Sequence, residues 1–171
     1  MQNIYLEFEG VDTLKGQSIS AQGKDQIELL SFSHGVSMPL SAGEPSNVSR
    51  RQGRTNHQDF TVTKYMDRTS PILNHYCSGG ANIKEAIITV YQASETGGKS
   101  APIAFFTYTL DNVIVSSVSV GGGGGDLPIE TLTLNYTAIT WAYKIQTQAG
   151  EQAAGDISAS WDLTKNDGES K

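Results

Sequence analysis

The sequence predicts a mainly β fold, an antiparallel β-barrel or two-sheet barrel with one short α-helix on its side and one long extended loop. Many short segments alternate apolar and polar residues, which is the period of a half-buried strand. Only one short stretch has helical spacing, and serine, threonine and glycine fill the connections. The 171 residues suit one domain. We expect a barrel domain over residues 1–148 and a C-terminal tail over residues 149–171, with a short edge strand.

The strands follow one another from the N terminus, where Ile4, Leu6 and Phe8 alternate with more polar residues. Further strands are predicted at residues 27–34, 60–65, 83–93, 103–120, 132–136 and 139–145. Asp111 and Asn112 leave two interpretations of residues 103–120, a hairpin or a single bulged strand. The last two segments also fit one long strand that bends near Thr137.

The helix is predicted just after the strand at residues 60–65. Asp67 or Thr69 suits the N-cap and Pro71 the first turn. Apolar residues then recur at helical spacing until residues 79–80, a glycine pair that ends the helix.

Charge and cysteine content exclude several classes of protein. The formal net charge of -6 argues against a nucleic-acid binder, which needs a basic surface. No segment approaches the roughly 20 apolar residues of a membrane span, so we expect no membrane insertion. Cys77 is the one cysteine and has no partner for an internal disulfide, which favours folding in a reducing cytoplasm. The N terminus lacks the basic start and apolar run of a secretory signal.

No catalytic, metal or cofactor site is predicted. His34, His57 and His75 lack the paired spacing of metal ligands. Cys77 lies at the C-terminal end of the predicted helix, where the helix dipole raises a thiol pKa, so a packing role is expected. The glycine run at residues 121–125 lacks the Lys-Ser/Thr of a phosphate-binding loop.

Two alternative functions stay open. Trp141 and Tyr143 alternate on a predicted strand, and aromatic rings of this kind stack on sugars in carbohydrate-binding β-sandwiches. A hydrolase on the same scaffold would use paired carboxylates, for which the strand residues Glu28, Glu85 and Glu130 are candidates.

Four segments, in order, resemble the Hcp (haemolysin-coregulated protein) family of type VI secretion tube proteins. They read LLSFSHGVSMP, GRTNHQDFTVTKYMDRTSPIL, YTLDNVIVSSVSVGG and LPIETLTLNYTAITWAYK, at residues 29–39, 53–73, 108–122 and 127–144. Together they span most of the chain. The tail from residue 149 continues past the family's usual last strand.

The resemblance implies a structural subunit rather than an enzyme. Such subunits form hexameric rings that stack into the inner tube of the secretion machine and carry effectors in the ring lumen. The implied partners are further copies of the chain, a spike protein at the tube tip, sheath proteins and secreted effectors, with no cofactor. The implied localisation is cytoplasmic assembly followed by secretion without a signal peptide.

The resemblance also assigns site residues. The long polar segment at residues 41–58 matches the family's extended loop, which reaches a neighbouring subunit or ring. Its expected inter-subunit and stacking residues are Ser41, Arg50, Arg51, Gly53 and Arg54. For the lumen, we expect Ser31 and Ser33, because the alternate face of their strand is polar.

Overall fold

The computed structural model describes residues 3–40, 53–96, 99–146 and 152–170. Within these ranges the chain forms one α-helix, α1 (Ser70–Gly79), one 3-10 turn, η1 (Asp12–Leu14), and a series of antiparallel strands. The strands are β1 (Asn3–Glu9), β2 (Ile27–Leu29), β3 (Ser31–Ser33), β4 (Val36–Ser37), β5 (Asn56–His57), β6 (Phe60–Tyr65), β7 (Asn82–Thr96), β8 (Lys99–Gly121), β9 (Ile129–Asn135), β10 (Ala138–Gln146), β11 (Gln152–Asp162) and β12 (Asp167–Ser170).

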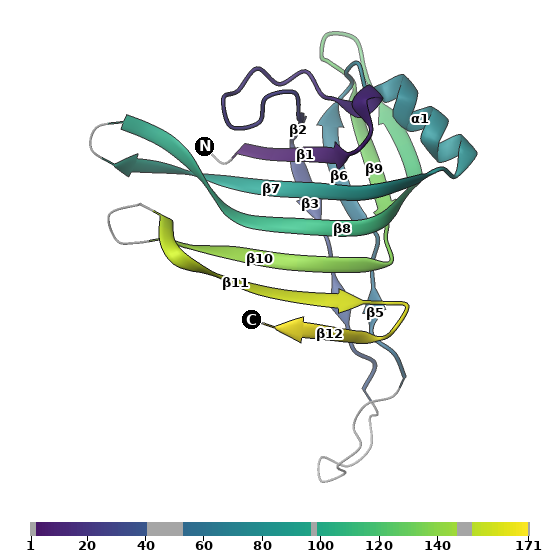
Figure 1. Ribbon diagram of the computed structural model, residues 1–171. Coiled ribbons are helices and arrows are strands. Elements are labelled where there is room, and N and C mark those ends of the chain that lie inside the picture. Colours follow the sequence, from purple (N-terminus) through teal and green to yellow (C-terminus); the bar gives the residue numbers. More distant parts are fainter. Residues whose placement is uncertain (1–2, 41–52, 97–98, 147–151, 171) are drawn as a thin grey trace.

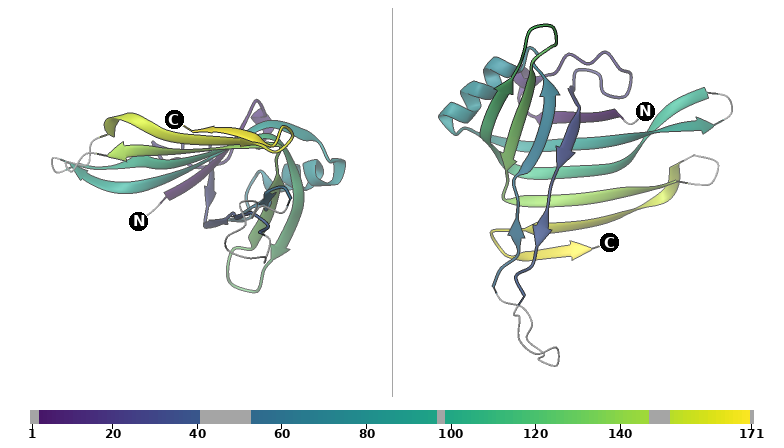
Figure 2. Two further views of the ribbon diagram at one scale, coloured as in Figure 1. Left: turned by 90° about the horizontal axis from the view of Figure 1, so that it is seen from below. Right: turned by 180° about the vertical axis from the view of Figure 1, so that it is seen from behind.

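The strands make two layers (Figures 1 and 2). One layer has the order β12-β11-β10-β8-β7-β1-β2, and a branch from β8 through β9 and β6 to β3 makes the other. All of these pairs are antiparallel. The prediction of a mainly antiparallel β fold with one short α-helix is therefore confirmed. The ladders between described strands follow an open, branched path and do not show a closed barrel.

The core lies between the two layers and takes one face of each strand. In β6, Phe60 and Val62 are buried while Thr61 and Thr63 are only partly so, which is the period of two expected for a sheet with one wet face. The same alternation buries one face of the other core strands. The core cluster includes Leu6, Ile27, Phe60, Val62, Leu73, Ile83, Ile88, Leu110, Val113, Leu132, Leu134 and Ile139.

Helix α1 lies against the edge of this core (Figure 1). Thr69 precedes its first residue, Pro71 lies in its first turn, and Gly80 ends it with a left-handed φ of 59°. Leu73 is fully buried, and Cys77 is among the partly buried residues that pack on the core. The expected helix and the packing of Cys77 agree with the structure.

A buried ionic cluster fixes the start of α1 to the sheet. Lys64 is on the core face of β6 and is fully buried, as is Glu130 of β9. The Lys64 Nζ lies 2.7 Å from Glu130 Oε2 and 2.8 Å from Asp67 Oδ1, and it donates to Ser70 Oγ at 3.2 Å. Ser70 Oγ in turn donates to Glu130 at 2.7 Å. The cluster thus joins two strands to the first helical turn.

Strand β8 is continuous, which decides between the two interpretations of residues 103–120. It passes through Asn112 at a φ of 53° and has an irregular register between Val115 and Ser117. It is therefore a single bulged strand, and its hairpin partner is β7. Residues 132–145 differ from the single bent strand considered above, because the chain leaves β9 at Tyr136 and enters β10, which pairs with β8 and β11.

The C-terminal residues belong to the larger layer. Strand β11 pairs with β10 from Asp162 to Asp156, and β12 returns along β11. Trp161 and Leu163 pack on the core. The described part of the tail is therefore a two-stranded hairpin, longer than a short edge strand. The domain boundary after residue 148 stays a prediction.

Candidate functional site

Two rows of hydroxyl groups cross the outer face of the smaller layer. Ser31 pairs with Thr63, Thr63 with Thr131, and Thr131 with Ser119. One step further along the strands a second row follows the same order, through Ser33, Thr61, Thr133 and Ser117. We call these eight residues the hydroxyl face. It spans β3, β6, β9 and β8, and the right view of Figure 2 looks onto these strands.

Strand alternation produces this face. The serines of both rows are exposed and the threonines half-buried, while the residues between them, such as Val62 and Leu132, point into the core. The hydroxyls interact across the strands, as between Ser31 Oγ and Thr63 Oγ1 at 2.7 Å. Both rows consist of uncharged groups that donate and accept hydrogen bonds. The carboxylate of Asp59 lies next to the second row, where it accepts from Ser116, and Ser116 Oγ lies 2.7 Å from Thr133 Oγ1.

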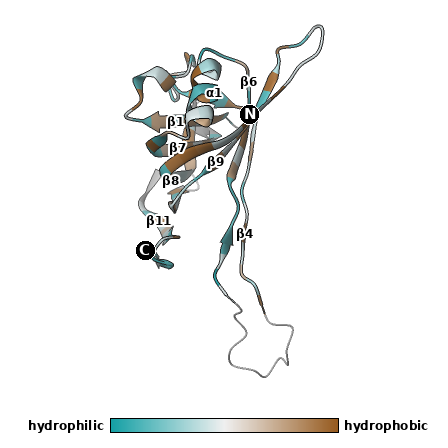
Figure 3. Cartoon of the chain, turned by 90° about the vertical axis from the view of Figure 1, so that its right-hand side faces the viewer, coloured by the Kyte–Doolittle hydropathy of each residue, from teal (hydrophilic) through white to brown (hydrophobic). Residues whose placement is uncertain are grey.

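A two-stranded ribbon projects from the same layer (Figures 1 and 3). We use the word ribbon for residues 35–40 and 53–58. Val36 pairs with His57 and Ser37 with Asn56, and the Gln58 N–H donates to the Gly35 carbonyl at 2.9 Å. In the described part of the chain, β4 and β5 form a separate two-stranded sheet. The ribbon continues in the direction of β3 and β6 and projects past β12, the last strand of the larger layer (Figure 1).

The root of the ribbon is a cluster of polar aromatic residues. The Tyr136 hydroxyl donates to the Gln58 carbonyl at 3.2 Å and lies 2.6 Å from His34 Nε2 and 3.5 Å from His57 Nδ1. The direction of the short bond between His34 Nε2 and the Tyr136 hydroxyl depends on the tautomer of His34. Trp141 lies next to both imidazoles, with ring centroids 6.5 and 6.2 Å away.

Both imidazoles favour the neutral form. Burial, and secondly the neighbouring His57, lower the pKa of His34, and burial lowers the pKa of His57. Burial and then the charge of Asp59 raise the pKa of Tyr136, so its phenol stays protonated. The root of the ribbon is therefore an uncharged hydrogen-bonded cluster at neutral pH.

An apolar groove runs between the ribbon and the larger layer, with a volume of about 510 Å³. Trp141 of β10 and Trp161 of β11 form one side, and the ribbon provides the other. We define the ribbon groove by all of its lining residues, Val36, Met38, Thr55, His57, Trp141 and Trp161. Val36 and Met38 are exposed, although both are large and apolar.

The structure places some of the predicted site residues and not others. Ser31 and Ser33 lie on the hydroxyl face and are exposed. Gly53, with a φ of 99°, and Arg54 are exposed at the outer described end of the ribbon. Ser41, Arg50 and Arg51 fall outside the described residues. Whether any of the five loop residues contacts another subunit stays a prediction.

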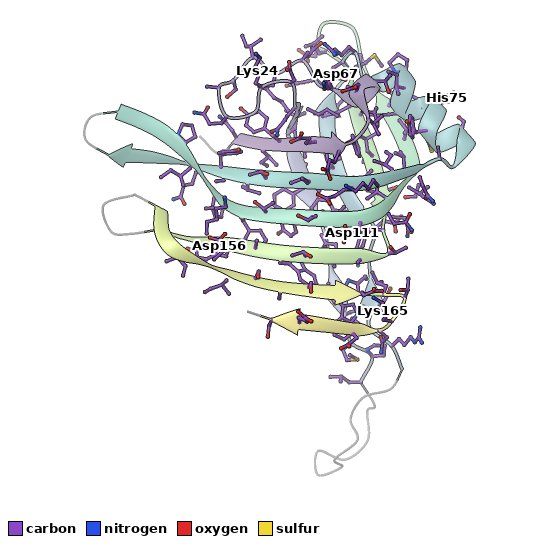
Figure 4. All side chains as sticks on the ribbon, in the orientation of Figure 1. Lys24, Asp67, His75, Asp111, Asp156 and Lys165 are labelled. Atoms are coloured by element: carbon purple, nitrogen blue, oxygen red, sulfur yellow. The ribbon has the colours of Figure 1, made fainter. Side chains whose placement is uncertain are left out.

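The residues considered for chemistry do not converge. Glu130 is buried in the ionic cluster, whereas Glu28 is exposed on β2 and accepts a hydrogen bond from Ser18. His75 lies on α1, far from the ribbon (Figure 4). Among the described residues, no three His, Cys, Asp or Glu side chains are close enough to hold a metal ion.

The threonine partners of Ser31 and Ser33 were not predicted from the sequence. The signal was present in the repeated Thr-x-Thr of residues 61–63 and 131–133, but only the strand register aligns these pairs. The ribbon groove was not predicted either, because its two tryptophans are contributed by different strands. No helix in the described part of the chain is long and apolar enough to cross a membrane.

Comparison with known proteins gives one consistent family. The family model described as "Type VI secretion system effector, Hcp" matches residues 5–143. The Pseudomonas aeruginosa protein named "Protein hcp1" is 32% identical over 160 residues, which cover 93% of this chain and 95% of that protein. A second protein of the same organism, named "Major exported protein", is 22% identical over 79% of this chain and 78% of its own length.

Solved structures agree with this comparison. A structure described as that of a type six secretion system protein superposes with a TM-score of 0.83 at 28% identity and covers 99% of this chain and 100% of its own. Hcp1 from Salmonella typhimurium has the same fold, with a TM-score of 0.75 at 24% identity over 98% of this chain and 99% of its own.

Proposed function

Because this chain belongs to the Hcp family of the type VI secretion system, we propose that it is a structural subunit of the secretion tube. In this proposal, copies of the chain close into hexameric rings, and the rings stack into the inner tube. Secreted effectors pass through or bind inside the ring lumen. The spike protein at the tube tip and the sheath around the tube are the other partners.

The observation that carries this proposal is the hydroxyl face. A channel that conducts folded or unfolded proteins of varied charge needs a hydrated wall that binds neither positively nor negatively charged proteins strongly. Two rows of Ser and Thr side chains across four strands provide such a surface, on the face opposite the buried core. We therefore propose that this face lines the lumen and that Ser31 and Ser33 belong to the wall.

The ribbon supports the assembly part of the proposal. A two-stranded extension that is not paired with the main sheet exposes apolar side chains at a cost in solubility, unless a neighbour covers them. We propose that the loop residues Ser41, Arg50, Arg51, Gly53 and Arg54 contact an adjacent subunit or ring. We assign no catalytic role, and we propose cytoplasmic assembly followed by export, in keeping with the name of the relative called "Major exported protein".

The first test is the solution mass of the purified chain by light scattering, followed by negative-stain imaging. The proposal predicts a species with six times the mass of one chain and ring-shaped particles with an open centre. A clean monomer at high protein concentration would contradict it.

The second test locates the hydroxyl face within the ring. In a Cys77→Ser background, Ser33→Cys places a thiol on the proposed lumen wall, and the isosteric Ser78→Cys on α1 is the matched control, since both serines are exposed. A small maleimide should label every copy of both variants. A maleimide on a bulky polymer should label every Ser78→Cys copy but only a fraction of Ser33→Cys copies, because six polymers do not fit one channel. Equal labelling would place the hydroxyl face outside the lumen.

A carbohydrate-binding module is the second candidate, and the ribbon groove is the observation that favours it. Trp141 and Trp161 both line the groove, and such rings stack on sugar faces. This function predicts a monomer whose tryptophan fluorescence changes when soluble oligosaccharides are added. A hexamer without such a change would eliminate it.

A further inference from the structure

The ribbon is joined to the rest of the chain at one polar point. Among the described residues, its hydrogen bonds to the two layers all involve Tyr136, whose hydroxyl donates to the Gln58 carbonyl at 3.2 Å and lies 3.5 Å from His57 Nδ1. His34 directly precedes the ribbon, and its Nε2 lies 2.6 Å from the same hydroxyl. A single phenol oxygen therefore connects both ends of the ribbon to the sheet. We call His34, His57 and Tyr136 the ribbon root.

The two imidazoles of the ribbon root lie close together among aromatic rings. The ring centroids of His34 and His57 are 6.3 Å apart. His34 stacks on Phe60 with a centroid distance of 5.4 Å, Trp141 lies beside both imidazoles, and Trp161 lines the same groove as His57. An aromatic face stabilises one cation. Two imidazolium ions at this distance repel each other, and both rings are half-buried, so water screens the repulsion poorly.

The charged neighbours in the described part of the chain do not neutralise two such cations. Asp59 is the nearby carboxylate, and it already accepts hydrogen bonds from Ser116 and Asn135. Its charge raises the pKa of Tyr136, whereas burial lowers the pKa of both imidazoles, and each imidazolium lowers the tendency of the other to form. Arg54, on the ribbon itself, is a further positive charge and is exposed. The groove side contributes only uncharged side chains of β10 and β11.

We propose that the ribbon root is a hinge operated by protons: when His34 and His57 are both protonated, the ribbon is released from the sheet while the two layers stay folded. Because the pKa values of both imidazoles are lowered, the release occurs below pH 6.5, the ordinary pKa of histidine. The hinge is a property of the single chain and does not rest on the proposed function. In the proposed tube, it would make the contacts of the ribbon with an adjacent subunit sensitive to acid.

The test is amide hydrogen exchange of the full chain, followed by mass spectrometry at about pH 8 and about pH 5, the limits between which histidine usually changes its charge. Each exchange rate is divided by the intrinsic rate at the same pH, which gives a protection factor. The protection of residues 35–40 and 53–58 should fall by about tenfold or more at the lower pH. The amides of β6 and β9 should keep their protection.

Three variants assign the response to the two imidazoles. His34→Gln/His57→Gln takes up no proton at the ribbon root and should show no fall in ribbon protection. His57→Gln keeps one imidazole and should lose most of the fall, because the hinge needs both charges. His75→Gln is the matched control and should behave as the wild type, since His75 is exposed on α1.

A titration of the wild-type imidazoles by NMR provides an independent measurement. The midpoint at which His34 and His57 become protonated should coincide with the midpoint of the loss of ribbon protection. This comparison also decides the case in which the double variant leaves the ribbon unprotected at both pH values, since it uses no substitution.

Several outcomes would overturn the hinge. Ribbon protection that does not change with pH, or that is lost before the imidazoles are protonated, would exclude it. An equal loss in the ribbon and in β6 and β9 would show acid unfolding of the whole chain. Light scattering separates this result from the proposed function: a monomer with an acid-sensitive ribbon would keep the hinge and exclude the tube, and a hexamer with a pH-independent ribbon would do the opposite.

Discussion

The buried ionic cluster predicts a large loss of stability when its cation is removed. In Lys64→Met, the replacement side chain fills most of the space of the fully buried lysine but cannot bond to Glu130 or Asp67. Glu130 then stays in the core without a cation, with a side chain that is 1% exposed. Breaking a buried ion pair from one side costs about 3–5 kcal/mol, because one charge is left uncompensated.

The matched controls separate this charge effect from a loss of packing. Lys84→Met removes a lysine that also lies close to a carboxylate, 3.3 Å from Glu9, but is 76% exposed. An exposed pair of this kind contributes about 0–1 kcal/mol. The double variant Lys64→Met/Glu130→Leu removes both buried charges and should recover much of the loss, since apolar replacements of buried pairs are often neutral.

The assay is urea unfolding followed by circular dichroism at one fixed protein concentration, because assembly would itself stabilise the fold. We expect that Lys64→Met lowers the free energy of unfolding by several kcal/mol more than Lys84→Met does. A loss below about 1 kcal/mol in Lys64→Met would refute it. So would a double variant that is less stable than Lys64→Met.

Three further predictions concern the ribbon root and the loop before β2. The pKa values of His34 and His57 are lowered, so their contribution to stability is present above pH 6.5, the ordinary pKa of histidine, and is lost as the pH falls below it. Urea unfolding at a series of pH values on both sides of 6.5 should therefore show a smaller loss of stability at low pH for His34→Gln/His57→Gln than for the wild type. Tyr136→Phe leaves the partners of its hydroxyl unpaired and should cost about 1–3 kcal/mol by the same assay, whereas a neutral result would mean that water replaces the hydroxyl. Gly16→Ala would drive a methyl group into a backbone carbonyl of the same loop and should lower the melting temperature, whereas Gly79→Ala, with open space around it, should not.

Strands with alternating patterns were predictable because one face of each strand is buried in the core. The alternation in residues 4–8 and 60–65 located β1 and β6, and the caps around Pro71 located α1. These signals are local, so they do not require knowledge of the partner strand. The same reasoning found that Ser31 and Ser33 lie on a polar face.

The register of the sheet was not predictable, and the missed features depend on it. Lys64 alternates in phase with Phe60 and Val62, but the strand alone does not identify the carboxylates that allow a lysine to be buried there. Glu130 and Asp67 meet it from another strand and from the helix start. The hydroxyl rows need three ladders to align. The tail is polar apart from Ile157, Trp161 and Leu163, which predicted a short edge strand. In the structure it forms a hairpin, and Trp161 and Leu163 pack this hairpin on the core.

The long strand β8 has a mechanical consequence. It pairs with β7 and β10 in the larger layer and, from Ile114 onward, with β9 in the smaller one. A force applied to one layer is therefore transmitted to the other along the covalent backbone, in addition to side-chain contacts. Load along a strand is shared by all the hydrogen bonds of its ladders, which must break together for the layers to slide. A subunit connected in this way transmits thrust with little internal shear.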